Sequence, residues 1–191
     1  NDLYNYLGIA GGDTSSLISS VMVQKQDSGT GVKVKIITQS NITKITSNQY
    51  ANAAITAGVS DVEIDVASVS KVTGESALTG VYKALEANGE TLDSDRTQVA
   101  QDELETTNEI AQNNADNSNF DSARLDQALV EIKQELAEIK QNQGSAATAE
   151  QVEQVVQDAL NKFNLSDIIS QDDIDKLIAF AKKYQNTSAI D

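Results

Sequence analysis

The fold of the N-terminal half is decided by residues 32–66, which read VKVKIITQSNITKITSNQYANAAITAGVSDVEIDV. Apolar residues alternate with lysines at the start of this stretch and with acidic residues at its end. Such alternation is typical of a strand with one buried face, so we expect strands over 32–38 and 62–69. A helix over 46–57 would join them into a β-α-β unit, whose two strands are parallel and whose crossover is right-handed.

The helix of this unit has clear signals at both ends. Thr46 and Gln49 stand three residues apart, as the N-cap and N3 residues of a capping box do. Gly58 lies where a helix commonly places a glycine just beyond its C-cap, because glycine adopts a left-handed backbone without steric cost.

The residues on either side extend the α/β pattern. A strand is expected over 21–26, where Val21, Met22 and Val23 are apolar. With the glycine-containing loop Asp27–Gly31 and the strand 32–38 that follow, it predicts a β-hairpin. A further helix is expected from about Glu75 to Asn88, ending at Gly89. Residues 1–90 are therefore predicted to form a small α/β domain with a mixed sheet.

The second half, 91–191, reads as an acidic helical domain. It carries 20 acidic and 8 basic residues, against 9 and 6 in residues 1–90. Capped segments with apolar residues at helical spacing predict four helices, near 93–113, 121–141, 149–163 and 171–185. The fold class is α+β: a small mixed sheet with a hairpin and a β-α-β unit, followed by an α-helical bundle.

Composition limits the chemistry. The 191 residues contain no histidine, cysteine, tryptophan or proline, and the net charge is -15. The usual ligands of zinc, haem and iron–sulfur clusters are missing, so we expect no cofactor and no metal site built from them. Nucleic acid is an unsuitable partner for so acidic a chain, and no apolar run is long enough to span a bilayer.

The segment Lys71–Gly80 is the strongest candidate site. It follows the strand 62–69 and opens a helix, and ligands of α/β sheets tend to bind beyond the carboxyl ends of strands. The candidate binding residues are Lys71, Thr73, Gly74, Glu75 and Ser76, where a helix N-terminus offers backbone N–H groups. The alternative interpretation is structural: Gly74 permits a tight turn, Thr73 or Ser76 caps the helix, and Gly80 allows close packing.

Other candidates have plainer explanations. The many carboxylates suit acid–base catalysis but also suit solvated helix faces. Residues 114–121 offer oxygen ligands for calcium, yet they lack the central glycine and terminal glutamate of an EF-hand loop. A Ser–Lys dyad at Ser68, Ser70 and Lys71 is disfavoured because neighbouring strand residues point to opposite faces.

Two stretches resemble a known family. Residues 45–61, reading ITSNQYANAAITAGVSD, and residues 73–83, reading TGESALTGVYK, are similar to a family of uncharacterised extracellular proteins of Gram-positive bacteria, catalogued as a domain of unknown function. The resemblance implies secretion or residence at the cell envelope, and it supplies no catalytic residues. It also implies a segment upstream of Asn1, without which the sheet would have an incomplete edge.

We therefore expect a non-enzymatic extracellular or cell-envelope protein that binds a protein partner or a wall component. The alternatives are a carboxylate-dependent hydrolase acting on a glycan or cell-wall polymer, and a small-ligand or anion binder at the turn 71–80. A hydrolase requires two carboxylates converging in a cleft, about 5–10 Å apart. The oligomeric state is not specified by any of these patterns.

Overall fold

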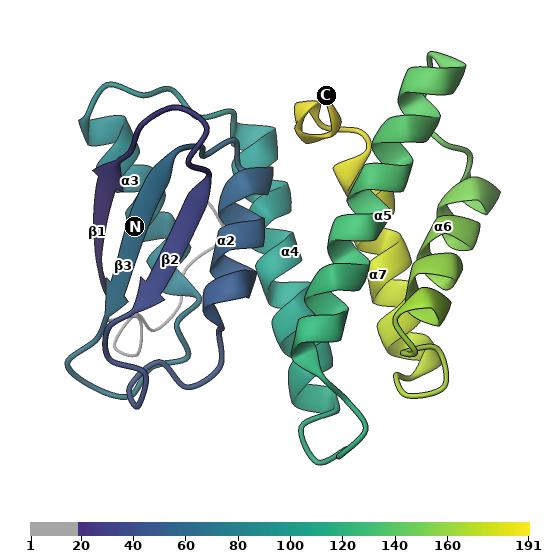
Figure 1. The fold of residues 1–191 in the computed structure, drawn as a ribbon, viewed down its shortest axis with the longest axis horizontal. Helices are drawn as coiled ribbons and strands as arrows, with labels where there is room; N and C mark the ends of the chain where they lie inside the picture. The colour runs from purple at the N-terminus through teal and green to yellow at the C-terminus, as the bar shows by residue number, and fades with distance from the viewer. Residues whose placement is uncertain (1–18) are drawn as a thin grey trace, which may run out of the picture. The chain divides into compact units, whose positions relative to one another are not determined.

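A computed structural model describes residues 19–191 (Figure 1). These residues form two compact units, unit 1 ending at Glu105 and unit 2 spanning Thr106–Asp191. Helix α4, Ser94–Asn113, continues from one unit into the other. The expected division into a small α/β domain, 1–90, and a helical domain, 91–191, stays a prediction. Residues 1–18 of its first part lie outside the described residues.

Unit 1 is built on a three-stranded mixed sheet. Strands β1 (Ser20–Lys25), β2 (Val32–Ile36) and β3 (Val62–Ala67) lie in the order β1-β3-β2, with β1 antiparallel and β2 parallel to β3. The α+β fold class and the parallel pair of the β-α-β unit are confirmed. The hairpin is wrong, because β1 and β2 do not pair and β3 lies between them.

The loop between β1 and β2 explains this order. Asp61, just before β3, accepts hydrogen bonds from the backbone N–H groups of Gly29 and Gly31 at 2.9 Å each. The loop therefore encloses the start of β3 instead of closing a tight turn. Two strands separated by a third lie about 10 Å apart, a span that a loop of this length reaches easily.

Helix α2, Ser47–Thr56, joins β2 to β3 and begins and ends as its sequence predicts. The Thr46 hydroxyl accepts a hydrogen bond from the Gln49 N–H, and the Gln49 side chain accepts one from the Thr46 N–H. Beyond the C-terminus, Gly58 has a φ of 91° and the Val59 N–H donates to Ala54 O. These bonds satisfy backbone groups that a helix end leaves unpaired.

Helix α3, Ser76–Ala87, follows β3 and corrects one expectation. Neither Thr73 nor Ser76 caps it. Its N-cap is Glu75, which has a helical backbone conformation and makes no side-chain cap hydrogen bond. The expected close approach at Gly80 is confirmed, because a Cβ atom there would lie 2.8 Å from a Val21 methyl group.

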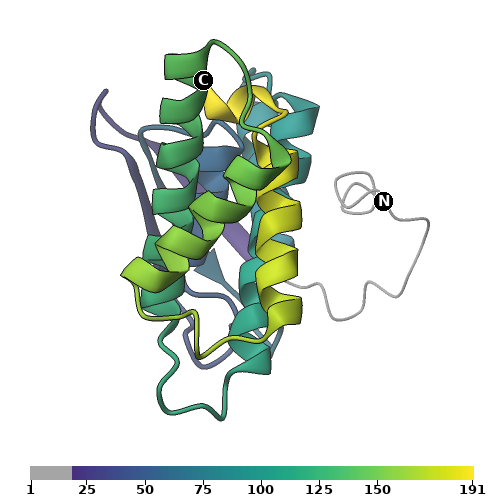
Figure 2. The same cartoon turned by 90° about the vertical axis from the view of Figure 1, so that its right-hand side faces the viewer.

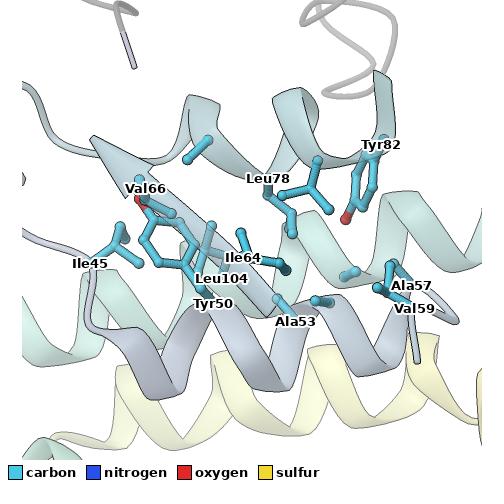
Figure 3. Packing of buried hydrophobic residues seen from close by; sticks show 14 of the residues in the cluster. Ile45, Tyr50, Ala53, Ala57, Val59, Ile64, Val66, Leu78, Tyr82 and Leu104 are labelled. Atoms are coloured by element: carbon cyan, nitrogen blue, oxygen red, sulfur yellow. The ribbon is translucent and has the colours of Figure 1, made fainter. Parts of the chain in front are cut away.

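The core of unit 1 lies on one side of the sheet (Figure 3). Val62, Ile64 and Val66 of β3 are nearly inaccessible and pack with buried residues of the helices. Those partners include Tyr50 and Ala53 from α2, Leu78 and Tyr82 from α3, and Leu104 from the first part of α4. The sheet and these helices therefore make two layers, and the second face of the sheet is the one that carries the polar alternation.

Unit 2 continues from the end of α4 with α5 (Ser122–Gln143), α6 (Ala149–Lys162) and α7 (Gln171–Tyr184), followed by the short helix η1 (Ser188–Ile190). Figure 2 shows the three long helices packed together. Asp121, Thr148 and Ser170 cap them through side-chain oxygens. The apolar seam of α5 is buried, and its innermost members are Leu125, Leu129, Ile132 and Leu136.

Candidate functional site

The candidate segment 71–80 begins where β2 and β3 end side by side. Beyond the strands, Val72 forms a parallel bridge with Ile42. The Val72 N–H donates to Asn41 O at 2.8 Å, and the Thr43 N–H donates to Val72 O at 2.9 Å. The carboxyl ends of the two parallel strands therefore continue into a hydrogen-bonded corner, which positions the residues that follow.

Gly74 lies inside this corner and is buried. Its φ is 107°, and its carbonyl oxygen accepts a hydrogen bond from the buried Tyr50 hydroxyl. A Cβ atom at position 74 would lie 2.5 Å from that hydroxyl and 2.8 Å from Ile42 Cγ2. Burial, together with the Glu75 charge, raises the pKa of Tyr50, so the hydroxyl remains a donor. Gly74 thus has a clear packing role.

The neighbouring candidates are also engaged within the fold. The Thr73 hydroxyl donates to the Glu75 carboxylate at 2.9 Å, and the Ser76 hydroxyl lies 2.9 Å from that of Ser19. All four of these residues are partly buried. Lys71 differs from them: it is exposed and forms no ion pair with any residue from 19 to 191. The structure therefore brings Thr73 and Glu75 together and leaves Lys71 as the accessible member.

A surface that the sequence interpretation missed lies on the second face of the sheet. We call it the open face, and its members alternate outward along the strands: Ser20, Met22 and Gln24 on β1, Lys33, Lys35 and Ile37 on and after β2, and Glu63, Asp65 and Ala67 on β3. Met22 is 58% exposed and Ile37 is 59% exposed. Val69, which follows β3, is 93% exposed.

These three residues are unusual in the molecule. Residues 19–191 contain five large apolar side chains that remain exposed, and the other two are Ile55 and Val130. The signal was present in the sequence, since Ile37 directly follows Ile36 and so places an apolar residue on the polar face. By itself, however, a residue that breaks the alternation indicates only that a strand ends there. Unit 1 therefore exposes large apolar side chains on the open face and directly after β3.

One ion pair on the open face joins neighbouring strands, and one lysine beside it has no such partner among the described residues. Lys35 lies 2.5 Å from Glu63, and this hydrogen bond, the Glu63 charge and the nearby Asp65 raise the pKa of Lys35. Lys33 stands opposite Glu63 in the register of β2 and β3 but forms no ion pair within residues 19–191. The face therefore combines free basic charge with exposed apolar surface.

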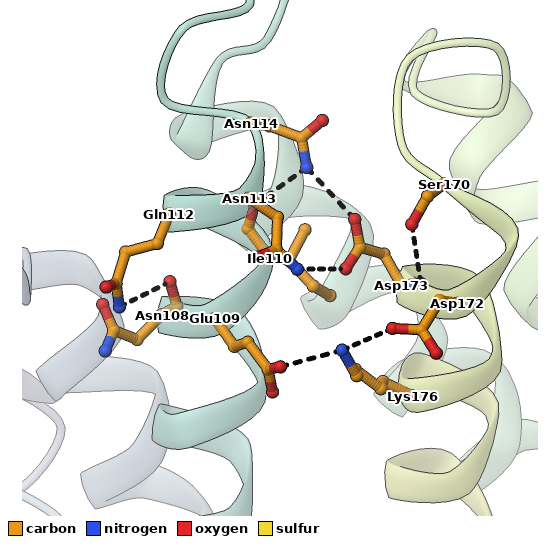
Figure 4. Close-up of polar contacts among 10 residues, drawn as sticks. All are labelled: Asn108, Glu109, Ile110, Gln112, Asn113, Asn114, Ser170, Asp172, Asp173 and Lys176. Atoms are coloured by element: carbon orange, nitrogen blue, oxygen red, sulfur yellow. Dashed lines mark hydrogen bonds and ion pairs between the residues drawn. The ribbon is translucent and has the colours of Figure 1, made fainter.

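The buried polar residues of unit 2 have a structural role (Figure 4). Asp173 is almost inaccessible and accepts hydrogen bonds from the amides of Asn113 at 2.8 Å and Asn114 at 3.2 Å. On the surface, Lys176 joins Glu109 at 2.8 Å to Asp172 at 2.6 Å. Both groups tie the end of α4 to the start of α7. Because Asn114 is committed to Asp173, the calcium alternative at residues 114–121 gains no support.

A groove of about 670 Å³ runs between α6 and α7 in unit 2. Its walls include the carboxylates of Glu150, Glu153 and Asp175, and Lys182 lies 3.1 Å from Glu153. A hydrogen bond to its own backbone N–H and one from Thr148 lower the pKa of Glu150, which is the opposite of what a general acid requires. Among residues 19–191, no group of three or more acidic side chains could hold a metal ion.

One carboxylate has the shift that a hydrolase would use. Burial, followed by the charges of Glu131 and Asp158, raises the pKa of Glu135 on α5. Glu135 does not line the groove between α6 and α7, and neither does Glu131. The geometry therefore does not place this acid in that groove.

Comparison with known proteins identifies the family. Residues 1–191 match the model described as "Protein of unknown function (DUF1002)", so the chain belongs to the DUF1002 family. "Uncharacterized protein YpuA" of Bacillus subtilis (strain 168) is 33% identical over 169 residues, which cover 88% of this chain and 52% of the relative. The chain thus spans about half the length of that relative. No solved structure matches it. Among residues 19–191, no helix has both the length and the apolar character needed to cross a membrane.

Proposed function

We propose that this member of the DUF1002 family is a non-enzymatic protein of the cell exterior or envelope, which binds a protein partner through the open face of its sheet. The observation that carries the proposal is that Met22, Ile37 and Val69, three of the five large apolar side chains exposed among residues 19–191, belong to the sheet of unit 1 and the segment just after it. Exposed apolar side chains that gather on one surface mark interaction sites more often than scattered ones do. Lys71 lies two residues beyond Val69 and contributes the one exposed charge of the candidate segment.

The extracellular location rests on the resemblance of residues 45–61 and 73–83 to secreted proteins. The absence of cysteine is compatible with that location and does not require it. Fractionation of Bacillus subtilis producing the relative, with antibody detection in medium, wall and cytosol, tests this part. Recovery in the cytosol alone would contradict it.

Site-specific crosslinking tests the proposed surface. A photoreactive phenylalanine analogue is placed at position 37 or 69, and at Val130 of unit 2 as a control that is 37% exposed. Irradiation with a Bacillus subtilis envelope fraction should give an adduct of discrete mass from positions 37 and 69, but not from position 130. Excess unlabelled protein should suppress the adduct, whereas the double variant Ile37→Ser/Val69→Ser should not.

Two results would overturn the proposal. One is equal labelling from position 130, and the other is full competition by the double variant. The hydrolase alternative is tested in the same fraction by measuring released reducing sugar with the unsubstituted chain and with Glu135→Gln. Release that depends on Glu135 would make the protein an enzyme.

A further inference from the structure

Within residues 19–191, the backbone groups along the outer edge of β2 have no strand partner. The Val62 N–H donates to Gly31 O, and the Ile37 N–H donates to Val66 O. Along a strand, the N–H and C=O groups of successive residues point to alternate sides. Those of Lys33 and Lys35 therefore face β3, as those of Gly31 and Ile37 do, while those of Val32, Val34 and Ile36 face away from it. No strand among residues 19–191 pairs with that side of β2. A row of free donors and acceptors of this kind accepts an added strand.

This edge belongs to the basic part of an acidic chain. Residues 28–60 contain three lysines and no acidic residue, although the net charge of the chain is -15. Two of these lysines, Lys33 and Lys35, lie on β2 with exposed side chains. The edge therefore offers positive charge at alternate positions, with partly buried valines between them.

The other side of β2 shows which strand these lysines accommodate. In the parallel register, Lys33 stands opposite Glu63 and Lys35 opposite Asp65. Opposite charges on neighbouring strands stabilise the pair, and like charges destabilise it. Lysines on an edge also disfavour pairing with basic strands or with β2 of a second copy, so the edge is selective for an acidic strand.

We propose that the free edge of β2 binds an extended acidic segment of a partner protein, which adds a fourth strand with carboxylates beside Lys33 and Lys35. This inference rests on the proposed protein-binding function and names the chemistry of the partner. Backbone hydrogen bonds to Val32, Val34 and Ile36 would supply affinity, and the alternating carboxylates would supply specificity. The β3 sequence, Val-Glu-Ile-Asp-Val, has the pattern that such a segment requires.

A peptide copying residues 60–68, SDVEIDVAS, is the probe, and its matched control SDVKIKVAS carries lysine in place of Glu63 and Asp65. We expect the acidic peptide to bind and to slow amide hydrogen exchange at Val32, Val34 and Ile36. The control peptide should bind about tenfold more weakly, because two attractive cross-strand pairs become repulsive. In the variant Lys33→Glu/Lys35→Glu the preference of the protein should reverse toward the control peptide.

A proline pair tests the backbone part. Val34→Pro removes an N–H that faces away from β3, so it should abolish peptide binding without breaking the native sheet. Val23→Pro is the matched control: Gln26 N donates to Asp61 O across β1 and β3, so the Val23 N–H faces away on the opposite edge. This control should bind the peptide normally. If Val34→Pro unfolds, the charge-reversal variant decides the question.

Several outcomes would overturn the inference. Equal affinity for the two peptides would refute the added strand, and so would unchanged hydrogen exchange at the amides of Val32, Val34 and Ile36. Displacement of the peptide by inorganic polyphosphate, with no amide protection, would make the lysines a site for polyanions. Protection at Val34 that rises with protein concentration alone would assign the edge to a second copy. If crosslinking from positions 37 and 69 persists but the acidic peptide does not bind, the proposed function stands and only the proposal for the edge of β2 is refuted.

Discussion

The two units use charged residues in different ways. In unit 2, Lys140, Lys162, Lys176 and Lys182 each have a carboxylate partner, and most of these pairs join different helices. In unit 1, Lys33, Lys44 and Lys71 are exposed and form no ion pair within residues 19–191. A single exposed ion pair contributes little to stability, so this difference between the units is not mainly one of stability. It concerns which lysines can contact a partner: the described part of unit 1 has exposed, unpaired lysines as well as exposed apolar side chains.

The cores test whether the units are energetically separate. Ile64 in β3 and Ile132 in α5 are both almost inaccessible, and each belongs to one unit. Ile64→Ala and Ile132→Ala should each lower the free energy of unfolding of their own unit by about 3 kcal/mol, through lost burial and a residual cavity. Hydrogen exchange measures this unit by unit. If either variant accelerated hydrogen exchange equally in both units, the units would unfold together and would not be energetically separate.

The corner behind the candidate site provides the next test. Gly74→Ala should destabilise unit 1 by about 2–4 kcal/mol, because it combines a left-handed backbone with overlap onto Tyr50 and Ile42. Gly89→Ala is the control: its φ is 86°, but no atom lies within 4 Å of the added Cβ. The control should lose only about 1 kcal/mol. If chemical denaturation gave a similar loss of stability for both variants, the residues around position 74 would accommodate the added methyl group and Gly74 would have no special packing role.

These cases also separate what the sequence could specify from what it could not. Thr46 and Gln49 bond to each other across three residues, so local sequence was sufficient to place α2. The hairpin prediction is wrong because the order of strands in a sheet is not set by local sequence. Asp61, thirty residues beyond Gly31, accepts a hydrogen bond from the Gly31 N–H at the start of β3, and β3 lies between the other two strands. The same limit applies at Gly74: a glycine at that position predicts a turn, but its hydrogen bond with Tyr50 depends on how the chain folds.

The candidate site follows the same logic. Lys71 could be placed beyond a strand end from pattern alone, and it is exposed there. Whether Thr73, Glu75 and Ser76 are free depends on which side chains reach them, and pattern gives no information about that. The open face was predictable in principle from the period of two, but its significance required the strand order. With β3 central, β2 is an edge strand of the sheet formed by residues 19–191, and its lysines have carboxylates beside them on one neighbouring strand only.

Helix caps give a smaller and more symmetrical test of the two units. Thr46 caps α2 and Thr148 caps α6 with matching reciprocal bonds, of 3.2 and 2.8 Å in one box and 3.3 and 2.9 Å in the other. Thr46→Ala and Thr148→Ala should each cost about 1 kcal/mol. Exchange should accelerate in α2 with the first and in α6 with the second. If one substitution accelerated exchange in both helices, the stabilities of the two units would be coupled although their cores are separate.

The smallest expected effect concerns two glutamates of unit 2 whose pKa values shift in opposite directions. The pKa of Glu135 is raised by burial and by neighbouring carboxylates, so the folded state binds its proton more readily than the unfolded chain does. Its stabilising contribution is present below the unfolded pKa and is lost as pH rises through the folded value. Glu135→Gln should therefore increase stability at pH 7 by about 0.5 kcal/mol, a modest figure because solvent screens the group.

Glu150 should behave in the opposite sense. Hydrogen bonds at the start of α6 lower its pKa, so its contribution is present above the unfolded pKa and is lost as pH falls through the folded value. Glu150→Gln should lower stability at pH 7, and the difference from the unsubstituted protein should vanish in acid. Urea midpoints at pH 7 and at about pH 3.5, near the reference range of glutamate, measure both variants. Shifts of the same sign would mean that the net charge of -15, rather than the local partners of each carboxylate, governs unit 2.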